Sequence, residues 1–553
     1  MKDAGVILEE HGTVGPHAAT KRREARRIPI LLLLPSLFIA AVMLLPVTYL
    51  IMRAVEGGPN IWPSVLRIRT LELLVNSIGL AAAVTLSTVL LAVPLAWLTT
   101  RSDIPGKRVW ATLAGLPLVI PSYVGAFAFI SALGPRGLLQ QGMEVLFGVN
   151  RLPSIYGFFG AWFVLTLFTY PYVFLTTKAA IHGLDPSLEE VSRSLRKGGL
   201  YTFWHVTLPQ LRPSIGAGGL LTAFYTLSDF GLVSLLQFDT LTRAIYLQYQ
   251  TSFDRSVAAV FALILVNLTA LVLLAESVTR GRSRYYRSSA RPARSIRVSS
   301  LGIWTAPALI FVSFVVFLAL ILPIGVLLYW LAHRLLEGGA DISFWANIAT
   351  SLIMNSLSAA GITAAITIVA ATPIAFLSVR YRSGLARVIE GCTYIGYALP
   401  GTVIALALVF FAARVATPLY QTFGLLILAY TLRFLPQAVG GIRSSLLQVN
   451  PHLEEAARGL GRSMSQTLTA ITLPLAWPGM LAGAALVFLT TMKELPATIL
   501  LSPIGFRTLA TAVWTGASEG FFADASIPAL ILIVISAIPL IIMADERRAE
   551  FGS

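Results

Sequence analysis

Four ionisable residues of this sequence lie inside long apolar stretches: Asp229, Arg433, Lys493 and Glu494. Ionisable groups inside a membrane span are costly and usually mark an ion or substrate path. Carboxylate oxygens suit a hard cation, and Arg433 is a candidate counter-ion for them. Lys493 and Glu494 are helix neighbours that do not face one another, so each needs another partner. Two interpretations stay open: a polar lining for a translocation path, or an ion-pair network that holds helices and a gate together.

Other chemistry is poorly represented. The single cysteine, Cys392, lies in an apolar run and forms no metal cluster with the six scattered histidines, so metal ligands stay unassigned. No G-x-x-x-x-G-K-[ST] phosphate-binding motif occurs, because Gly106-Lys107-Arg108 lacks the Ser or Thr. We therefore expect no enzyme activity and no cofactor in this chain.

The composition describes the elements that must position these residues. Of 553 residues, 56% are hydrophobic and 12% are charged, with a mean hydropathy of +0.77. Soluble proteins carry about 25% charged residues, so a soluble enzyme, a disordered scaffold and a secreted disulfide framework are excluded. The net charge of +15 fits basic cytoplasmic loops beside anionic lipid, and we expect no nucleic-acid partner.

Twelve apolar segments are long enough to span a bilayer, since one helix needs about 20 residues. They cover about 28–52, 76–100, 109–133, 157–181, 212–237, 256–277, 302–332, 355–379, 388–413, 422–441, 478–502 and 524–543. The sequence therefore predicts an all-α polytopic membrane protein with about 12 transmembrane helices.

The distribution of basic residues predicts the orientation. Arginines and lysines concentrate in the loops 101–108 and 380–387 and in the segment 279–300, which is a basic linker without an apolar period. Such residues favour the cytoplasmic side. We expect a cytoplasmic N-terminal tail at 1–27, a cytoplasmic linker and a cytoplasmic C-terminal tail at 544–553.

The chain contains a tandem repeat. At an offset of 279, Asn76 matches Asn355, Pro94 matches Pro373 and Pro121 matches Pro400; further on, the offset falls to 265. The first half therefore has 14 extra residues, which we place near 134–156. Two homologous domains of six spans each, at 28–278 and 301–543, would enter the membrane in the same orientation, with a pathway between them.

A polar segment follows the fourth span of each half. In the second half it runs from Pro451 to Pro474, with carboxylates in the first helical turn and Gly461 at a position suited to a sharp exit. A short polar helix of this kind, between two spans, is shaped to enter another protein's groove. The alternative is an ordinary amphipathic helix that connects two spans and has no docking role.

This segment closely resembles the EAA loop of binding-protein-dependent ABC importer permeases, E-A-A-x3-G-x9-I-x-L-P. The matching residues are Glu455, Ala456, Ala457, Gly461, Ile471, Leu473 and Pro474. The corresponding segment of the first half, about 186–209, keeps only Glu190, Leu208 and Pro209, and it has Arg196 where the pattern has Gly, which leaves its turn geometry open.

The resemblance implies a type I ABC importer permease fused from two domains. It implies that both loops dock into two cytoplasmic ATPase subunits, which bind ATP and Mg, and that an external substrate-binding protein delivers the substrate. The chain would lie in the bacterial inner membrane.

Two sequence segments resemble those of the fused permeases of ferric-iron importers: L-S-D-F-G-L-V-S-L-L (227–236) and M-K-E-L-P-A-T-I-L-L (492–501). Permeases for thiamine, phosphonate and polyamine share much of the sequence of these segments, so these substrates remain alternatives. An ion-coupled secondary transporter is a more distant alternative, against which the EAA loop argues.

Overall fold

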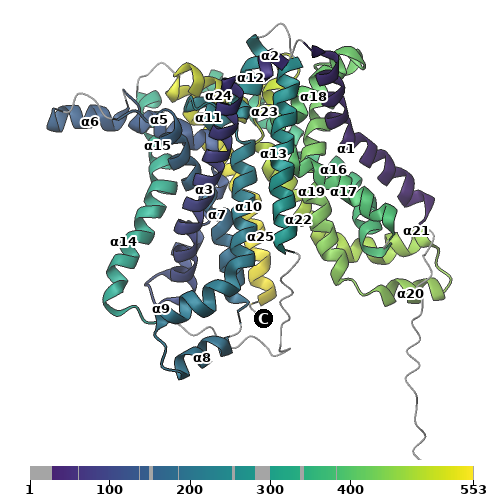
Figure 1. The fold of residues 1–553 in the computed structure, drawn as a ribbon, viewed down its shortest axis with the longest axis horizontal. Coiled ribbons are helices and arrows are strands. Elements are labelled where there is room, and N and C mark those ends of the chain that lie inside the picture. Colours follow the sequence, from purple (N-terminus) through teal and green to yellow (C-terminus); the bar gives the residue numbers. More distant parts are fainter. Residues whose placement is uncertain are drawn as a thin grey trace, which may run out of the picture.

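The computed structural model describes residues 28–59, 62–135, 137–148, 153–184, 186–251, 256–280, 299–336, 342–381 and 383–551. Within the described residues, every regular secondary-structure element is a helix (Figure 1). The predicted tail at 1–27 and most of the predicted linker lie outside the described residues.

The first half contains α1 (Ile30–Glu56), α2 (Trp62–Val65), α3 (Ile68–Arg101), α4 (Lys107–Leu113), α5 (Ser122–Leu133), α6 (Leu138–Phe147), α7 (Phe158–His182), α8 (Pro186–Ser194), α9 (Gly199–Thr202), α10 (Leu208–Ser228), α11 (Gly231–Leu235), α12 (Leu241–Thr251) and α13 (Ser256–Arg280). The second half contains α14 (Thr305–Val316), α15 (Leu322–Leu336), α16 (Ile342–Arg380), α17 (Gly384–Ala398), α18 (Gly401–Arg414), α19 (Phe423–Gln448), α20 (Pro451–Gly459), α21 (Met464–Thr467), α22 (Leu473–Met492), α23 (Pro496–Leu501), α24 (Leu509–Glu519) and α25 (Phe522–Phe551).

Among the described residues, eight helices are long and apolar enough to cross a membrane, and two bent pairs would each add one span. The two other predicted segments correspond to α10 and α25. The polytopic all-α prediction is confirmed, but the spans predicted at 109–133 and 388–413 are not continuous helices. Their halves meet at angles of 97° and 104°.

Each bend lies at a proline. Pro121 precedes α5 and Pro400 precedes α18, and the residue before each is extended: Ile120 has a ψ of 120° and Leu399 a ψ of 108°. A proline disfavours the helical conformation of the residue before it, so each apolar run is split. The spans predicted at 212–237 and 478–502 also end early, because α10 ends at Ser228 and α22 at Met492.

The repeat is visible in matching cross-connections. The Asn76 amide donates to the carbonyl of Asp239 at 3.0 Å, and Asn355 donates in the same way to Arg507 at 2.9 Å. The extra residues of the first half lie between α5 and α7, where they form α6; between α18 and α19 there is only a short turn.

The first helix of each half packs against the other half. α1 lies beside α16, α17 and α18, and the Tyr49 hydroxyl on α1 donates to the carbonyl of Phe410 on α18 at 3.0 Å. α15 correspondingly lies beside α5 of the first half (Figure 1). Both large hydrophobic cores therefore contain residues from both halves: one joins Met43 to Leu435, and the other joins Phe127 to Val312.

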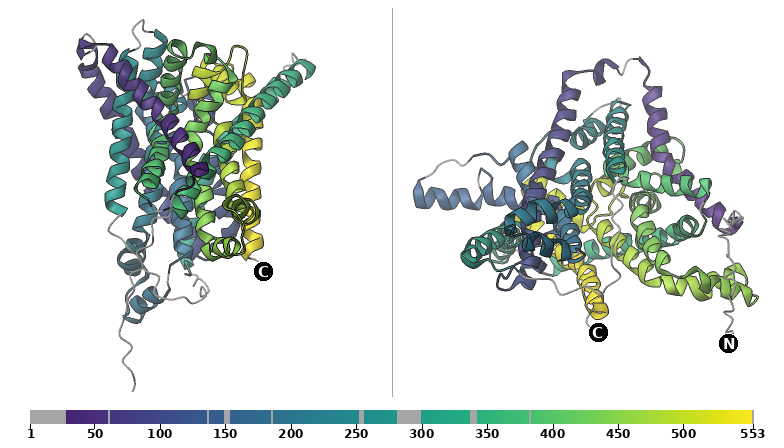
Figure 2. Two further views of the ribbon diagram at one scale, coloured as in Figure 1. Left: turned by 90° about the vertical axis from the view of Figure 1, so that its right-hand side faces the viewer. Right: turned by 60° about the horizontal axis from the view of Figure 1, so that its bottom comes forward.

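The polar helices between the spans gather at one end of the molecule. Figure 1 and Figure 2 place α8, α9, α20 and α21 at the end where α25 terminates. The short helices α2, α11, α12, α18, α23 and α24 lie toward the opposite end (Figure 1). The two EAA-type loops therefore project from the same side of the membrane-spanning body.

Candidate functional site

The second EAA loop, residues 451–474, forms a helix and a sharp turn. Asn450 caps α20, because its side chain accepts a hydrogen bond from the amide of His452 at 3.0 Å. After α20 ends, Gly461 adopts a φ of +84°, and the Arg462 amide donates to the carbonyl of Ala457 at 3.1 Å. This is a left-handed helix exit of the kind that glycine favours. The turn predicted at Gly461 is confirmed.

The first loop, residues 186–209, makes the same turn without glycine. Arg196 occupies the position that matches Gly461 and adopts a φ of +58°. The next amide, of Lys197, donates to the carbonyl of Ser192 at 3.2 Å, as Arg462 does to Ala457. The turn geometry that the sequence left open is therefore the same in both loops, although an L-residue with a side chain pays about 1–2 kcal/mol for it.

Each loop helix is fastened to the end of a spanning helix by an ion pair. Arg380, the last residue of α16, lies 2.9 Å from the carboxylate of Glu454 on α20. Arg101, the last residue of α3, lies 3.5 Å from Glu189 on α8. The Thr472 hydroxyl also donates to Glu454 at 3.2 Å, and Thr207 donates to Glu189 at 2.9 Å.

The sequence prediction missed these two carboxylates. It selected the neighbouring Glu455 and Glu190, and both of these are exposed on the loop helices. Residues adjacent on a helix point about 100° apart, so one member of each Glu-Glu pair faces the body and the other faces away. The matching arginines at the ends of α3 and α16 are the signal that identifies the inward member.

The other predicted docking residues also divide into those that face the membrane-spanning body and those that face away from it. Ala457 is buried against the body; Ile471, Leu473, Leu208 and Pro209 are partly buried; and Ala456, Gly461 and Pro474 are exposed. The outer faces also carry exposed apolar side chains: Leu188, Val191 and Leu195 on the first loop, and Leu453 and Leu460 on the second. An apolar, partly charged surface on a projecting helix is typical of a protein-docking site.

Three of the four intramembrane charges, Asp229, Lys493 and Glu494, lie at helix breaks, so their prediction within continuous spans was wrong. Arg433 lies inside α19, within a span as predicted. Asp229 directly follows α10, and its Oδ1 accepts from the amide of Leu232 at 2.9 Å at the start of α11. The Ser122 hydroxyl, which follows the Pro121 break, donates to the other oxygen of Asp229. The side chain is 7% exposed, so the carboxylate is buried with hydrogen bonds at both oxygens.

The second half satisfies its carboxylate with a different partner. Glu494 follows α22 and accepts from the amide of Ala497 at 3.3 Å, and its Oε2 lies 3.2 Å from Nε of Arg433. Gly401, which matches Ser122 in the repeat, leaves room for the guanidinium. A Cβ at Gly401 would overlap Nη1 of Arg433 and would lie 2.5 Å from Oε1 of Glu494. The prediction of Arg433 as a counter-ion is confirmed by this ion pair.

The breaks of the two halves interlock. Lys493 donates to the carbonyl of Leu118, in the short 3-10 turn Leu116–Val119 before Pro121, at 2.8 Å. Gly231 lies so close to Leu495 that a Cβ would approach the Leu495 side chain to 2.9 Å. Phe230 packs against Trp514 with ring centroids 5.2 Å apart. Lys493 and Glu494 thus have separate partners, as predicted, although Glu494 lies beyond the end of α22 rather than on a helix.

The carboxylates at the helix breaks are held by groups of this chain. Within the described part of the chain, no group of three or more His, Cys, Asp or Glu side chains is placed to hold a metal ion. Asp229 and Glu494 are both engaged by groups of this chain, so neither carboxylate is free to ligate a cation in this conformation.

Comparison with known proteins defines the class. The chain belongs to the family described as binding-protein-dependent transport system inner membrane component, whose model matches residues 26–284 and 367–545. The two matched segments agree with two fused copies of one unit. The chain is therefore a multi-pass permease of a binding-protein-dependent importer in a bacterial inner membrane.

Particular relatives share most of its length. The chain is 36% identical, over 94% of its own length and 98% of the relative's, to the Fe(3+)-transport system permease protein FbpB 2 of Haemophilus influenzae. It is 24% identical to the ferric transport system permease protein FbpB of Actinobacillus pleuropneumoniae, over 83% and 69% of the two lengths. The molybdenum transport system permease protein ModB of Escherichia coli is 30% identical, over 32% of this chain and 80% of the relative.

Proposed function

We propose that this chain is the complete pore of an ATP-driven importer for ferric iron. The observation that carries the proposal is the 36% identity to an Fe(3+)-transport permease along 98% of that relative's length. The similarity to a molybdenum permease extends over only 32% of this chain. The substrate would be delivered by an external binding protein and would pass between the two halves.

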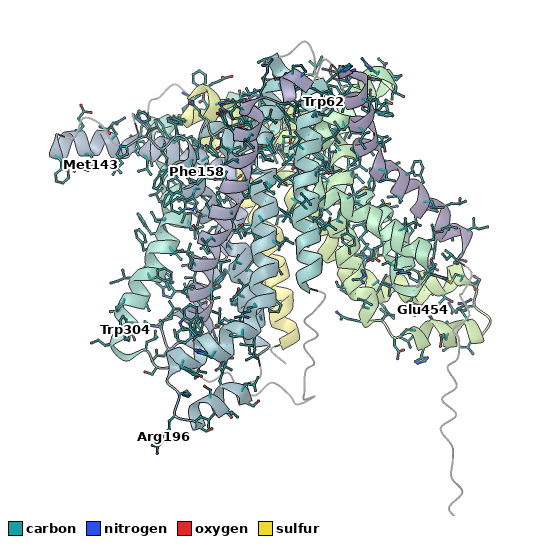
Figure 3. The ribbon with its side chains drawn as sticks, viewed as in Figure 1. Trp62, Met143, Phe158, Arg196, Trp304 and Glu454 are labelled. Carbon is teal, nitrogen blue, oxygen red and sulfur yellow. The ribbon has the colours of Figure 1, made fainter. Side chains whose placement is uncertain are left out.

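The two loops supply docking sites for two cytoplasmic ATPase subunits, which bind ATP and Mg. Exposed Leu453 and Leu460 beside Glu455, and exposed Leu188 and Val191 beside Glu190, support this assignment. Both loops project from the same end (Figure 3, which labels Arg196 and Glu454). With the ATPases in the cytoplasm, that end is cytoplasmic, and we propose a cytoplasmic location for both chain termini as well.

The ion pairs Arg101–Glu189 and Arg380–Glu454 transmit motion from the loops to the pore. Each arginine ends a long spanning helix. α3 packs against α7 and α10 in the first half, and α16 packs against α19 and α22 in the second. When the ATPases close and shift α8 and α20, the pairs pull on α3 and α16. The interlocked breaks at Asp229 and Glu494 then separate, and the released carboxylates line the path for a hard cation.

Docking is tested by Glu455→Lys in the assembled transporter. We expect the variant to insert normally but to retain ATPase subunits poorly during purification. The matched control is Glu519→Lys, an exposed glutamate at the end of α24, which should retain them fully. ATPase recovery with Glu455→Lys equal to that of the unmodified chain would contradict the docking assignment.

The substrate is tested in proteoliposomes that contain the transporter and its binding protein. Uptake of radiolabelled ferric iron that requires ATP and resists excess molybdenum, thiamine, phosphonate and polyamine supports the proposal. Transport of one of those solutes in place of iron overturns the substrate. Uptake by this chain alone, driven by an ion gradient, overturns the ATP-driven mechanism.

A further inference from the structure

Helix α6 is an element of the first half without a counterpart in the second. Its base is anchored in the body, because Leu138 packs against a buried cluster of Ala128, Ala132 and Val326. Gln140 is also buried, with 4% of its surface exposed. Beyond this base the helix leaves the body, and Gly148, with a φ of +67°, ends it.

The outer part of α6 has two chemically different sides. At about 100° per residue, Leu139, Met143 and Leu146 lie on one side, and Gln141 and Glu144 lie on the other. The apolar side is uncovered: Leu139 is 47% exposed and Leu146 75%, and Phe147, which flanks them, is 71% exposed. An amphipathic helix with so much uncovered apolar surface needs an apolar environment on one side and water on the other.

The position of α6 indicates what that environment is. Figure 1 and Figure 2 show α6 projecting sideways from the body, away from α3 and α7. Figure 3 places Met143 close to the level of Phe158, where the spanning helix α7 begins, at the end opposite Arg196. Phe158 and Phe159 are 45% and 63% exposed, as in the aromatic belts at membrane surfaces. α6 thus lies outside the bundle of spanning helices, at the level where α7 begins.

We propose that α6 is an interfacial helix that lies in the headgroup layer of the leaflet opposite the EAA loops. Its apolar side rests on the acyl chains, and Gln141 and Glu144 face water. Because the helix extends away from the pore, it lies over the bilayer and widens the contact of the first half with that leaflet.

The test places single nitroxide labels on α6 in the assembled transporter. Cys392→Ala removes the native thiol, and Leu139→Cys, Leu146→Cys, Gln141→Cys and Glu144→Cys introduce one label each. In vesicles of phosphatidylethanolamine and phosphatidylglycerol, we compare collision with oxygen, which concentrates in lipid, and with a water-soluble nickel chelate. Val369→Cys, on the spanning helix α16 and 74% exposed, is the lipid-facing reference.

We expect the oxygen-to-nickel ratio at Leu139 and Leu146 to be several-fold higher than at Gln141 and Glu144, and to approach the Val369 value. Equal and low ratios at all four positions would overturn the proposal. Labels at Leu139 and Leu146 that meet the nickel chelate freely until the external binding protein is added, and are shielded only then, would also overturn it by assigning the surface to that protein.

Discussion

Arg380 Nη2 lies 2.9 Å from Glu454 Oε1, and this contact joins the end of the longest spanning helix to the loop helix α20. Both side chains are largely buried, with 12% and 13% exposed. The first half repeats the arrangement with Arg101 and Glu189. The pair therefore connects the loop that we propose as a docking surface with the spanning helices of the same half.

Reversing the charges of the Arg380–Glu454 pair should show whether the pair couples ATP hydrolysis to uptake or only supports the fold. Arg380→Glu leaves two carboxylates in contact, and loss of a hydrogen bond to a charged group costs about 1–3 kcal/mol. We expect ATP hydrolysis to continue while substrate uptake falls at least several-fold. The double variant Arg380→Glu with Glu454→Arg should recover part of the uptake. A double variant no better than the single one would argue against a specific pair.

Gly401→Ala should disrupt the ion pair at the helix break. The added Cβ overlaps the Arg433 guanidinium, and overpacking of this kind costs about 1–3 kcal/mol. We expect a lower unfolding temperature in detergent and reduced uptake. Gly361→Ala on α16, where a Cβ meets nothing within 4 Å, is the matched control and should leave stability unchanged or raised.

Glu494→Ala should impair uptake while the complex still assembles. The substitution leaves Arg433, whose side chain is only 19% exposed, without its carboxylate, and breaking a buried pair costs about 3–5 kcal/mol. The double variant Arg433→Leu with Glu494→Leu removes both charges and should regain stability. If that double variant also transports normally, the pair is only scaffolding; if it is stable but inactive, the carboxylate belongs to the path.

Arg196→Gly should stabilise the turn of the first EAA-like loop. Glycine adopts a positive φ without the steric cost that Arg196 carries, about 1–2 kcal/mol. We expect amide exchange across 192–197 to slow by roughly fivefold or more, since 1.4 kcal/mol is a factor of ten. Gly461→Ala should accelerate exchange in the second loop, and unchanged exchange in both variants would contradict this assignment of strain.

Asp103 should make the contact between the two halves sensitive to acid. Its carboxylate accepts from the Leu301 amide at 3.0 Å, and this hydrogen bond lowers the pKa of the carboxyl. A lowered folded-state pKa means that the contact stabilises above the unfolded pKa of about 3.9 and is lost as pH falls through the folded value. Exchange at Leu301, corrected for intrinsic rate, should therefore rise only in strong acid, and Asp103→Asn should remove the pH dependence.

Hydropathy and the repeat predicted the helical class and the twofold organisation, but not the breaks. Pro121 and Pro400 interrupt their helices, whereas Pro94, Pro171, Pro373 and Pro436 lie inside helices. A proline alone therefore does not determine whether a helix is interrupted. Tertiary packing determines which apolar segment bends. The same limit applied to the Glu-Glu pairs, because the inward member is defined by an arginine far along the chain.

The packing of α1 against the second half was also beyond the sequence. Nothing in the apolar stretch of α1 distinguishes a partner in its own half from α16, α17 and α18. Long apolar helices carry little directional information about their neighbours, since most apolar faces are chemically alike. The contact between Tyr49 and Phe410 is visible only in three dimensions.

This exchange of first helices has a consequence for how the protein is made. Ribosomes add about 5–20 residues per second, so α1 enters the bilayer tens of seconds before α18, which receives its tyrosine, has been synthesised. Lipid must cover that face of α1 in the meantime. If the halves were separate polypeptides, each would have to find the other before its core closed. A single chain keeps the late partner tethered and makes that search intramolecular.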